Sequence, residues 1–557
     1  MNLIQQIIQR PAIVIKHMLL LFCLAIVSLQ STAQRDTTKK QSIDITSSFK
    51  PVLRDAVKIN LSGSQLNADN SKIVGPYNIP SQNLFYAYQP ISIKPLALEQ
   101  DSNLYLGDRM FVKAGFGNYT TPYLKAGLSF GDGKTSLVNV YGSYIASKGD
   151  IRNQDYSLLD VKGTGSLFFK NNEAYASAGF SDKHYYLYGY DHGLYDYKKD
   201  EVSQELQDIN IKAGIRNTAT TQLGINYDPN IQFNFFTNRN RLTENTISFD
   251  LPAEKKFGDA FAFKVDAKAD ISNYSTTGFV PANYKLTNNL VQIAPALVYY
   301  SPNFTINGGI TPAWNNGKFS WLPNIYLEAK VPDKPFMVQA GWVGRYTNNT
   351  YRNLSAINPY LLGLTAETNT KETEYYGGIK ASIGKHFVFN AKAGWIMYKD
   401  LPFFINDTAT DSKGFVVANE SKVNDLRIHG DLSFMSQDKF TLTAGLTLNG
   451  YTGMQDNARA WNTVPLDFTA SMRYWAFKKL LLKGDFNFFG GGNYLLKGNT
   501  SYAFSGGSDL SAGAEYKINK QFSAWLDINN IFNNKYERWH NYQVYGLNLV
   551  GGIIVNF

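Results

Sequence analysis

The side chains that most often carry chemistry are few in this sequence and lie far apart along it. The six histidines are His17, His184, His192, His386, His429 and His540, and their spacing matches no zinc-binding pattern. The closest pair, His184 and His192, bounds a tyrosine-rich run. Two interpretations of this run stay open: a metal or ligand site on an external loop, or an aromatic belt whose tyrosine rings lie at the membrane–water interface, which we favour.

Other catalytic patterns are missing from the sequence. The only cysteine, Cys23, lies in an apolar N-terminal stretch, so the chain after it has no disulfide, thiolate ligand or cysteine nucleophile. No linear Ser-His-acid signature of a hydrolase is present. The glycine-rich runs 490–492 and 505–508 lack the Gly-Lys-Ser/Thr ending of a phosphate-binding loop. We therefore expect no enzyme and no cofactor.

Aromatic side chains in predicted loops are the best candidates for ligand contact. They are Tyr190, Trp461, Tyr494 and Trp539, in a chain with 36 Tyr and 36 Phe. Rings of this kind stack on sugars or cover apolar ligands. The alternative, which we favour for each of them, is that the ring anchors the protein at a membrane–water interface.

Strands with alternating side chains must position these loops. Apolar and polar residues alternate in segments such as 124–130, 138–144, 387–397, 480–488 and 522–528. A period of two places the apolar residues on one face of each strand. The opposite faces include Lys392, Asp485 and Asp527, and such charges suit a water-filled interior better than a small protein core.

Short and long connections alternate between these strands. Short ones fall near 132–134, 170–172, 217–219, 253–258, 301–303, 330–335, 384–385, 436–438, 477–479 and 518–520. Long ones fall near 148–157, 188–205, 273–286, 348–371, 399–423, 452–464, 491–507 and 532–543. Outer-membrane barrels have short periplasmic turns and long external loops. The sequence therefore predicts an all-β fold: a transmembrane antiparallel β-barrel of about 22 strands over residues 109–557, in the cell outer membrane.

The N-terminus has the parts of an export signal. Arg10 and Lys16 precede the apolar stretch Met18–Leu29, and Ser31–Ala33 supplies a small-residue cleavage site. The apolar stretch is shorter than the ~20 residues that a spanning helix needs. We predict a signal peptide over residues 1–33. The net charge of +9 then becomes about +7 (9 − 2), and because the basic residues are scattered we expect no nucleic-acid partner.

Residues 34–108 differ from the rest by their prolines and their lack of clean alternation. We predict a short, irregular N-terminal segment, periplasmic or lumenal. A bore of about 22 strands is too wide for wall side chains to fill. Three candidates to occlude it stay open: residues 34–108 as a partial plug, external loops folded inward, or a partner protein.

The last segment of the chain carries a pattern typical of barrel assembly. Alternation predicts that one face of the final strand bears Tyr545, Leu547, Leu549, Ile553, Val555 and Phe557. A terminal aromatic residue on such a strand resembles the signal read by the barrel-assembly machinery. We therefore expect that machinery and outer-membrane lipid to be partners of the chain.

The segment before this strand resembles the C-terminal end of TonB-dependent receptors. The resemblance lies in Asn530, Phe532, Asn533 and Tyr536 of the run 530–536, followed by Trp539, Tyr542, Gly546 and the terminal Phe557. It implies a 22-stranded barrel with an N-terminal plug and uptake driven by an energy-coupling inner-membrane complex. The sequence departs from the family at Leu547, where arginine is common, and in the 75 residues from 34 to 108, fewer than the family's plug needs.

Two functional hypotheses follow. The first is transport of a solute across the outer membrane, favoured by the C-terminal motif. The second is a non-transporting barrel that scaffolds an outer-membrane assembly or secretion complex with a partner protein, favoured by the short N-terminal segment. A passive porin is disfavoured because a 22-strand bore without a constriction would leak.

Overall fold

A computed structural model describes residues 110–557, except 277–282, 384–385, 437–438 and 497–499. The predicted signal peptide and the predicted segment 34–108 lie outside the described residues. Within the described ranges, no helix combines the length and the apolar composition needed to cross a bilayer.

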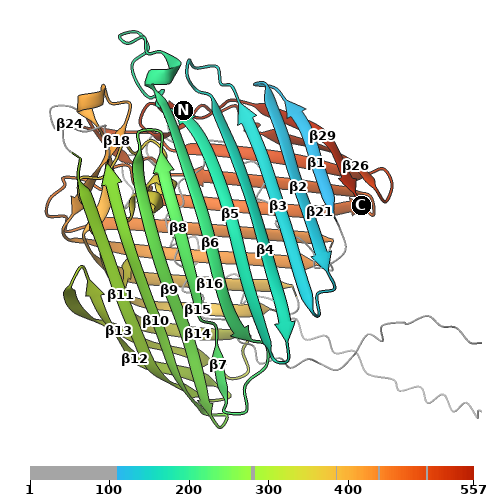
Figure 1. Ribbon diagram of the computed structural model, residues 1–557, viewed down its shortest axis with the longest axis vertical. Coiled ribbons are helices and arrows are strands. Elements are labelled where there is room, and N and C mark those ends of the chain that lie inside the picture. Colours follow the sequence, from blue (N-terminus) through green and yellow to red (C-terminus); the bar gives the residue numbers. More distant parts are fainter. Residues whose placement is uncertain (1–109, 277–282, 384–385, 437–438, 497–499) are drawn as a thin grey trace, which may run out of the picture. The chain divides into compact units, whose positions relative to one another are not determined.

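Most of the described strands form one antiparallel sheet that closes on itself (Figure 1). The first strand, β1 (Phe111–Gly117), pairs with β2 (Thr121–Gly131) on one side and with the last strand, β29 (Asn548–Asn556), on the other. Phe111 thus faces both Gly127 and Asn556. Closure leaves no unpaired edge in the membrane, which is the condition for strands to cross it.

The strand count depends on one interruption. Among the described residues the sheet has 23 segments, including β7 (Ile225–Tyr227) and β8 (Asn230–Asn238). Both pair with β9 (Leu242–Phe257) in one continuous register, from Ile225↔Lys255 to Thr237↔Thr243. Pro229 lies between them and has no N–H to give to the ladder. They form one strand, so the described barrel has 22 (23 − 1), which confirms the predicted fold.

The other barrel strands follow in chain order, each paired with its neighbours. They are β3 (Ser136–Ser147), β4 (Tyr156–Phe169), β5 (Asn172–Tyr186), β6 (Ser203–Asn217), β10 (Phe261–Thr276), β11 (Lys285–Tyr300), β12 (Phe304–Asn315), β13 (Lys318–Lys330), β14 (Phe336–Thr347), β15 (Thr370–Ile383), β16 (Phe387–Lys399), β19 (Val423–Ser436), β20 (Phe440–Thr452), β21 (Leu466–Phe477), β22 (Leu480–Phe489), β25 (Gly507–Lys517) and β26 (Phe522–Asn529).

The elements outside the barrel wall lie in the long connections. They are two short 3-10 turns, one helix and three hairpins: η1 (Lys199–Glu201), η2 (Thr408–Thr410), α3 (Tyr351–Ile357), β17 (Leu401–Asn406) with β18 (Phe415–Glu420), β23 (Asn493–Leu496) with β24 (Thr500–Ala503), and β27 (Glu537–Trp539) with β28 (Tyr542–Gln543).

Short connections lie at one end of the barrel and the long connections at the other, with two departures from the predicted pattern. The predicted turn at 253–258 is misplaced, because β9 continues to Phe257 and the turn spans 258–260. At the long-loop end, the short connections 118–120, 239–241 and 316–317 were not predicted. Each of these connections is a turn of two or three residues between neighbouring strands, so only the longer loops can extend far beyond the strand ends.

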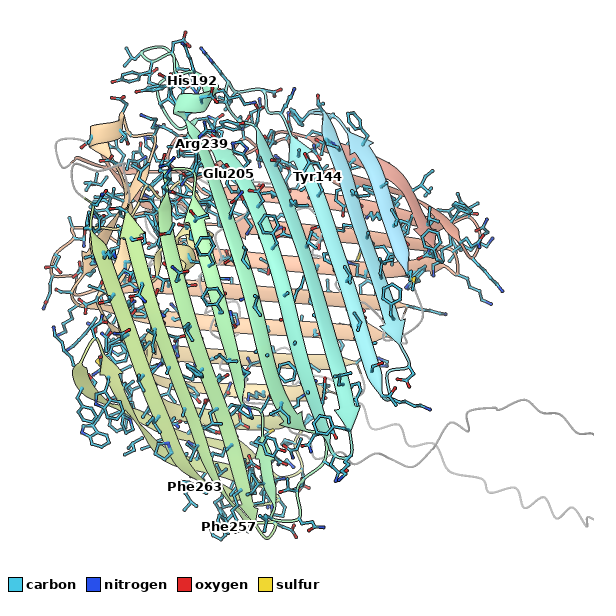
Figure 2. The ribbon with its side chains drawn as sticks, in the orientation of Figure 1. Tyr144, His192, Glu205, Arg239, Phe257 and Phe263 are labelled. Carbon is cyan, nitrogen blue, oxygen red and sulfur yellow. The ribbon has the colours of Figure 1, made fainter. Side chains whose placement is uncertain are left out.

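The outer wall is apolar and fits a hydrocarbon environment. Phe116, Trp321 and Ile553 point outward and are 62%, 61% and 54% exposed. Near the short turns, aromatic rings of adjacent strands touch, as in Phe387–Phe434 at 4.5 Å and Phe434–Phe440 at 5.8 Å. Figure 2 shows Phe257 and Phe263 at this end. Bands of this composition mark the membrane–water interface, so this wall crosses the outer membrane.

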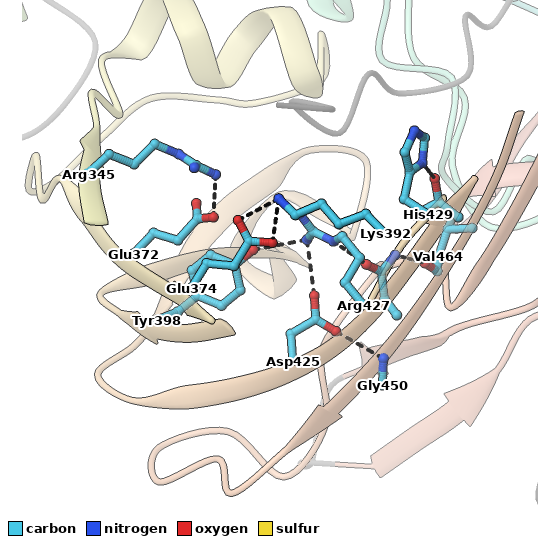
Figure 3. A network of polar contacts seen from close by, with 12 residues as sticks. Arg345, Glu372, Glu374, Lys392, Tyr398, Asp425, Arg427, His429, Gly450 and Val464 are labelled. Atoms are coloured by element: carbon cyan, nitrogen blue, oxygen red, sulfur yellow. Dashed lines mark hydrogen bonds and ion pairs between the residues drawn. The ribbon is translucent and has the colours of Figure 1, made fainter. Parts of the chain in front are cut away.

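The inner wall carries charges that are paired across neighbouring strands (Figure 3). Lys392 on β16 contacts Glu374 on β15 at 2.8 Å, and Arg345 on β14 contacts Glu372 on β15. Arg473–Asp485 and Lys483–Glu515 also join neighbouring strands, whereas Lys113–Asp527 and Lys380–Glu328 each reach across one intervening strand. A buried charge is tolerated when a partner and further hydrogen bonds satisfy it, and these pairs supply such partners.

Candidate functional site: the external loop cap

The long external loops fold onto one another and build a hydrophobic core above the barrel. The segments involved are 187–202, 348–369, 400–422 and 530–547, together with the ends of nearby strands. The buried members of this core, called the loop cap below, are Leu187, Tyr188, Tyr190, Val202, Leu206, Phe236, Leu242, Tyr274, Tyr351, Leu354, Tyr360, Leu361, Leu364, Phe404, Phe415, Trp539 and Tyr542. Of the three predicted ways to occlude the bore, inward-folded loops are therefore present.

Helix α3 ties one loop to the inner wall. Thr350 caps the helix by accepting a hydrogen bond from the N–H of Asn353, and the chain leaves the helix at Asn358, just before a proline. Glu244 of β9 accepts a hydrogen bond from the N–H of Arg352 at 3.1 Å. The guanidinium of Arg352 then makes two hydrogen bonds of 2.8 Å to Asp208 of β6. The helix is thereby held by two strands of the barrel.

Hairpin β17–β18 forms the second part of the cap. Backbone hydrogen bonds join it to the loop after α3: Leu362 donates to Phe415, and Phe415 donates to Tyr360, each at 3.0 Å. Phe415 is fully buried and Phe404 nearly so. Strand-type bonding between two loops over fifty residues apart makes them move as one unit.

Three tyrosines connect three different loops at the centre of the cap. The rings of Tyr360 and Tyr542 stack at 3.5 Å, and Tyr188 packs edge-on against Tyr542 at 4.8 Å. The hydroxyl of Tyr542 donates to the backbone oxygen of Lys413, and that of Tyr188 donates to the backbone oxygen of Gln543. Burial raises the pKa of Tyr188, Tyr360 and Tyr542, so all three remain protonated donors near neutral pH.

Trp539 and Arg538 fill the space beneath hairpin β17–β18. Trp539 is 1% exposed and lies edge-on to Phe404 at 5.3 Å and to Phe415 at 5.5 Å. Arg538 donates to the backbone oxygen of Asn462 at 3.1 Å. Burial lowers the pKa of Arg538 to about 9, which still leaves it charged at neutral pH. The cap thus encloses a cation as well as aromatic rings.

A cavity of about 320 Å³ lies at the external end, between the cap loops and segment 148–155. It is lined by Ile151, Tyr188, Tyr190, Asp191, His192, Glu537, Asn541 and Gln543. Tyr188 and Tyr190 are buried, whereas Asp191 and His192 are exposed at the rim, and Figure 2 shows His192 at the loop end of the molecule. The volume is at the lower limit of pockets that bind small molecules.

Hydrogen bonds fix the lining of this cavity. The ring of His192 lies tilted against that of Tyr190, with centroids 4.2 Å apart, and its Nε2 lies 3.0 Å from the backbone oxygen of Tyr188. The side-chain amide of Asn541 donates to Gly189, while its backbone N–H donates to Glu537 at 2.9 Å. Burial acts to raise the pKa of Glu537, but the hydrogen bonds from His540 and Asn541 hold it below the usual value. Glu537 is therefore ionised at neutral pH.

The structure separates the four aromatic residues predicted to contact a ligand. Tyr190 lines the cavity, although it is only 3% exposed. Trp461 and Trp539 are buried inside the loop packing, and Tyr494 is half-buried against His540, with ring centroids 3.6 Å apart. Contact of Trp461 or Trp539 with a ligand requires the loops to separate, and for all four residues it stays a prediction.

Of the other cavity residues, Tyr188, Asp191 and His192 lie in the tyrosine-rich run that was considered as a possible ligand site, whereas Ile151, Glu537, Asn541 and Gln543 were not predicted. Asp191 lies in the tyrosine-rich run between the two histidines, so the signal that singled out this run also covers it. Glu537 and Asn541 follow the C-terminal motif, and no pattern distinguishes them from other loop residues. Within the described ranges, no group of three or more His, Cys, Asp or Glu side chains is arranged to hold a metal ion.

The motif at 530–536 builds a turn. Asn530 has a left-handed backbone (φ 49°), and its amide donates 2.8 Å hydrogen bonds to the backbone oxygens of Asn534 and Tyr545. Asn533 accepts from the N–H of Leu547, and Tyr536 is buried with its hydroxyl 3.3 Å from Asp509. Phe532 points outward and is 49% exposed. These residues hold the two ends of the last external loop together.

The predicted barrel-assembly residues share an outer face, with one exception. Leu547, Leu549, Ile553 and Phe557 are 36%, 38%, 54% and 71% exposed, and the register places Val555 with them. Tyr545 does not belong to this face: it is 3% exposed and packs against Tyr119 and Tyr156. The prediction for Tyr545 is wrong because β29 begins only at Asn548. Recognition by the assembly machinery stays a prediction.

Comparison with known proteins shows that the barrel is similar in fold to solved transporters and receptors. No protein-family model and no curated protein sequence matches the chain. Among solved structures, it is similar to the FrpB iron transporter from Neisseria meningitidis (TM-score 0.62, 10% identity, 81% of each chain covered). It is also similar to the siderophore receptor PirA from Acinetobacter baumannii (0.62, 12%, 81% of this chain and 80% of that one). A third is a variant of the ferric enterobactin receptor PfeA from Pseudomonas aeruginosa (0.59, 12%, 81% and 80%).

At this identity the likeness concerns the fold. The chain is an outer-membrane β-barrel with the 22-strand fold of TonB-dependent receptors, as the C-terminal motif predicts. The structures that it resembles are named as transporters and receptors, and their ligands are properties of those proteins.

Proposed function

We propose that this protein transports a small solute across the outer membrane, with the external cavity as the first binding site and the loop cap as the gate. The observation that carries this proposal is the position of the cavity. Its lining comes mainly from segments 187–202 and 530–547, which also form the core of the cap. A solute bound there touches the loops whose packing closes the mouth.

A short chain of contacts links the cavity to the centre of the cap. Gln543 lines the cavity and accepts a hydrogen bond from Tyr188 through its backbone oxygen. Its neighbour Tyr542 stacks on Tyr360 and bonds to hairpin β17–β18 at Lys413. Binding that shifts segment 541–543 therefore strains the contacts between three loops. A ligand moves such an equilibrium only by its different affinity for the closed and open states.

Energy coupling is part of this proposal. The fold is that of receptors driven by an inner-membrane complex, and a cap of this size needs an input of free energy to open. Residues 34–108 are then a partial plug and the segment on which that complex acts. They lie outside the described residues, so support for this role comes from their position before the first strand.

A second candidate function is a closed scaffold for an outer-membrane assembly. The observation in its favour is the burial of Trp539 and Arg538, because fully buried large side chains are typical of permanent cores. A scaffold retains the cap closed at all times and binds partner proteins instead of a solute. Detergent-stable partners on purification, with no solute-dependent change in the loops, favour this candidate.

Single-channel conductance in planar bilayers tests the gate. Four forms are compared: the chain from Gln34, the same chain without residues 34–108, the chain with hairpin residues 402–419 replaced by a short Gly-Ser linker, and the chain with both changes. If loops and plug each seal the bore, only the form with both changes conducts in large steps. If the loops alone seal it, shortening the hairpin suffices. Large steady currents through the unaltered chain would overturn the proposed gate.

A further inference from the structure

We propose that the external cavity selects a small hydroxylated organic cation, of the amino-sugar or amino-alcohol class, and rejects anions. This inference rests on the proposed function, since it names the substrate class of the same site. The evidence is the charge of the cavity lining, its hydrogen-bonding groups and its size.

The charge of the lining is negative. Asp191 and Glu537 contribute carboxyl groups, and none of the described residues that line the cavity is Lys or Arg. Three basic side chains on the surrounding loops are engaged elsewhere: Arg152 pairs with Asp196, Lys199 with Asp155, and Lys535 with Asp150. An anionic solute would meet two carboxylates without a compensating cation, whereas a protonated amine supplies the missing charge.

The remaining lining groups suit hydroxyls. Carboxylate and amide oxygens of Asp191, Glu537, Asn541 and Gln543 accept hydrogen bonds, and a sugar or amino alcohol presents several O–H donors. The exposed ring of His192, which lies against Tyr190, offers a face on which C–H groups pack. A cation without hydroxyl groups would make fewer hydrogen bonds with these acceptors.

The size of the cavity limits the ligand to about one six-membered ring. Its volume of about 320 Å³ is at the lower end for small-molecule pockets. A bare metal ion is a poorer occupant, because within the described ranges no three metal-ligating side chains converge. A single-ring amine with hydroxyl groups matches the charge, the acceptors and the volume together.

The test is a binding titration of the full mature protein in detergent. Binding is measured as the change in tyrosine and tryptophan fluorescence. Three probes share one ring and differ in charge: glucosamine, glucose and glucuronate. At about pH 7 and low salt, we expect glucosamine to bind tighter than glucose, and glucuronate to give no response. Added sodium chloride should weaken the binding of glucosamine more than the binding of glucose, because salt screens the charge on the rim. Equal binding of all three probes, or preference for glucuronate, overturns the inference.

Matched variants locate the effect. The substitutions Asp191→Asn and Glu537→Gln retain the shape of the side chain and one acceptor oxygen but remove the charge. Each should lower the affinity for glucosamine about tenfold and leave the affinity for glucose nearly unchanged. Asp200→Asn is the control, because Asp200 lies on the same loop, is 92% exposed and does not line the cavity. If Asp200→Asn weakens glucosamine as much as the other two, the general charge of the loop is responsible and the inference fails.

Binding and transport can fail separately. If the protein binds glucosamine selectively but the cap never opens in bilayers, the proposed ligand class is supported and the proposed transport function is contradicted. A gate that opens when the hairpin is shortened, in a protein that binds none of the three probes, would leave the gate standing and remove the proposed ligand class.

Discussion

The buried carboxylate of Glu420 accepts a hydrogen bond of 2.6 Å from the backbone N–H of Gln455. The N–H groups of Asp456 and Asn457 donate to the same carboxylate at 3.1 and 2.8 Å. One side chain at the end of hairpin β17–β18 therefore holds the loop 453–465. Burial acts to raise the pKa of Glu420, but these donors hold it below its usual value.

Replacing Glu420 with Gln should release this loop. The amide retains one oxygen and turns an N–H₂ group toward backbone donors, so we expect a loss of about 2 kcal/mol in local stability. Limited proteolysis within residues 453–465 of the purified protein should become faster by roughly thirtyfold. Asp259→Asn, at the exposed turn between β9 and β10, makes the same chemical change and should have no effect. Unchanged proteolysis of E420Q would show that the loop is held by other contacts.

The same hydrogen bonds predict an acid-sensitive loop. The folded pKa of Glu420 lies below the unfolded value of about 4.3, so its contribution to stability is present above that pH and is lost as the pH falls further. Proteolysis of the loop by an acid-stable protease should accelerate below about pH 4 in the unaltered protein. E420Q should show no such acceleration from this position.

The wall of the barrel could be predicted from the sequence because the alternation of apolar and polar residues that defines each strand lies within a short segment of the chain. Alternation over ten or so residues sets the outward face of a strand, as at 387–397 and 522–528, whatever the rest of the chain does. The missed connection at Asn316-Gly317 carried the usual signal of a two-residue hairpin turn, with φ values of 48° and 79°. Tyr119, Thr120 and Arg241 also adopt positive φ, but their residue types carry no such signal.

The loop cap could not be predicted in the same way. Tyr188, Tyr360 and Tyr542 meet although more than 150 residues separate each from the next, and nothing in the neighbourhood of any one of them specifies the other two. The sequence pointed to aromatic loop residues, and Tyr190, Trp461 and Trp539 are indeed in the loops. It could not tell a ring that faces solvent from one that closes a core, because that difference depends on contacts between distant loops.

Truncation of Trp539 should loosen the cap. Trp539→Ala removes a ring enclosed by Phe404 and Phe415, and buried Trp→Ala changes cost about 3–5 kcal/mol. We expect the near-ultraviolet circular dichroism signal of the loops to weaken, and single-channel recordings to show brief openings. Trp321→Ala is the control, because Trp321 is 61% exposed on the outer wall and contacts none of the cap residues. Silent recordings with an intact dichroism signal would contradict a tightly packed cap.

Replacing Arg427 alone on the inner wall should destabilise the barrel more than replacing both Arg427 and its ion-pair partner Asp425. Arg427 makes hydrogen bonds of 3.0 Å to Asp425, 2.9 Å to Tyr398 and 2.8 Å to Asn449 (Figure 3). Asp425 is fully buried, so Arg427→Leu leaves it without its cation, at about 3–5 kcal/mol.

The Arg427 prediction is checked by thermal unfolding in detergent, followed as the loss of the compact gel band. R427L alone should unfold at a clearly lower temperature than the double variant Asp425→Asn with Arg427→Leu, because the second change removes the stranded charge. Arg459→Leu, at an exposed loop position, should unfold like the unaltered protein. Additive effects of the two changes would mean that Asp425 does not depend on Arg427.

Glu367 should give the cap a pH dependence opposite to that of Glu420. Burial, together with the nearby charge of Glu244, raises the pKa of Glu367 to about 8. The folded state therefore binds this proton more tightly than the unfolded chain, whose glutamates titrate near about 4.3. The contribution of Glu367 to stability is greatest below about pH 4 and is lost progressively as the pH rises to about 8.

Protease cleavage within residues 348–369 should accordingly speed up from pH 5 to 9. Glu367→Gln, neutral at every pH, should cancel most of that increase and resist cleavage better than the unaltered protein at pH 9, whereas exposed Glu201→Gln should leave the profile as it is. A profile unaffected by E367Q would mean that Glu367 is ionised within the closed cap, and the pH response would then have to arise from another group.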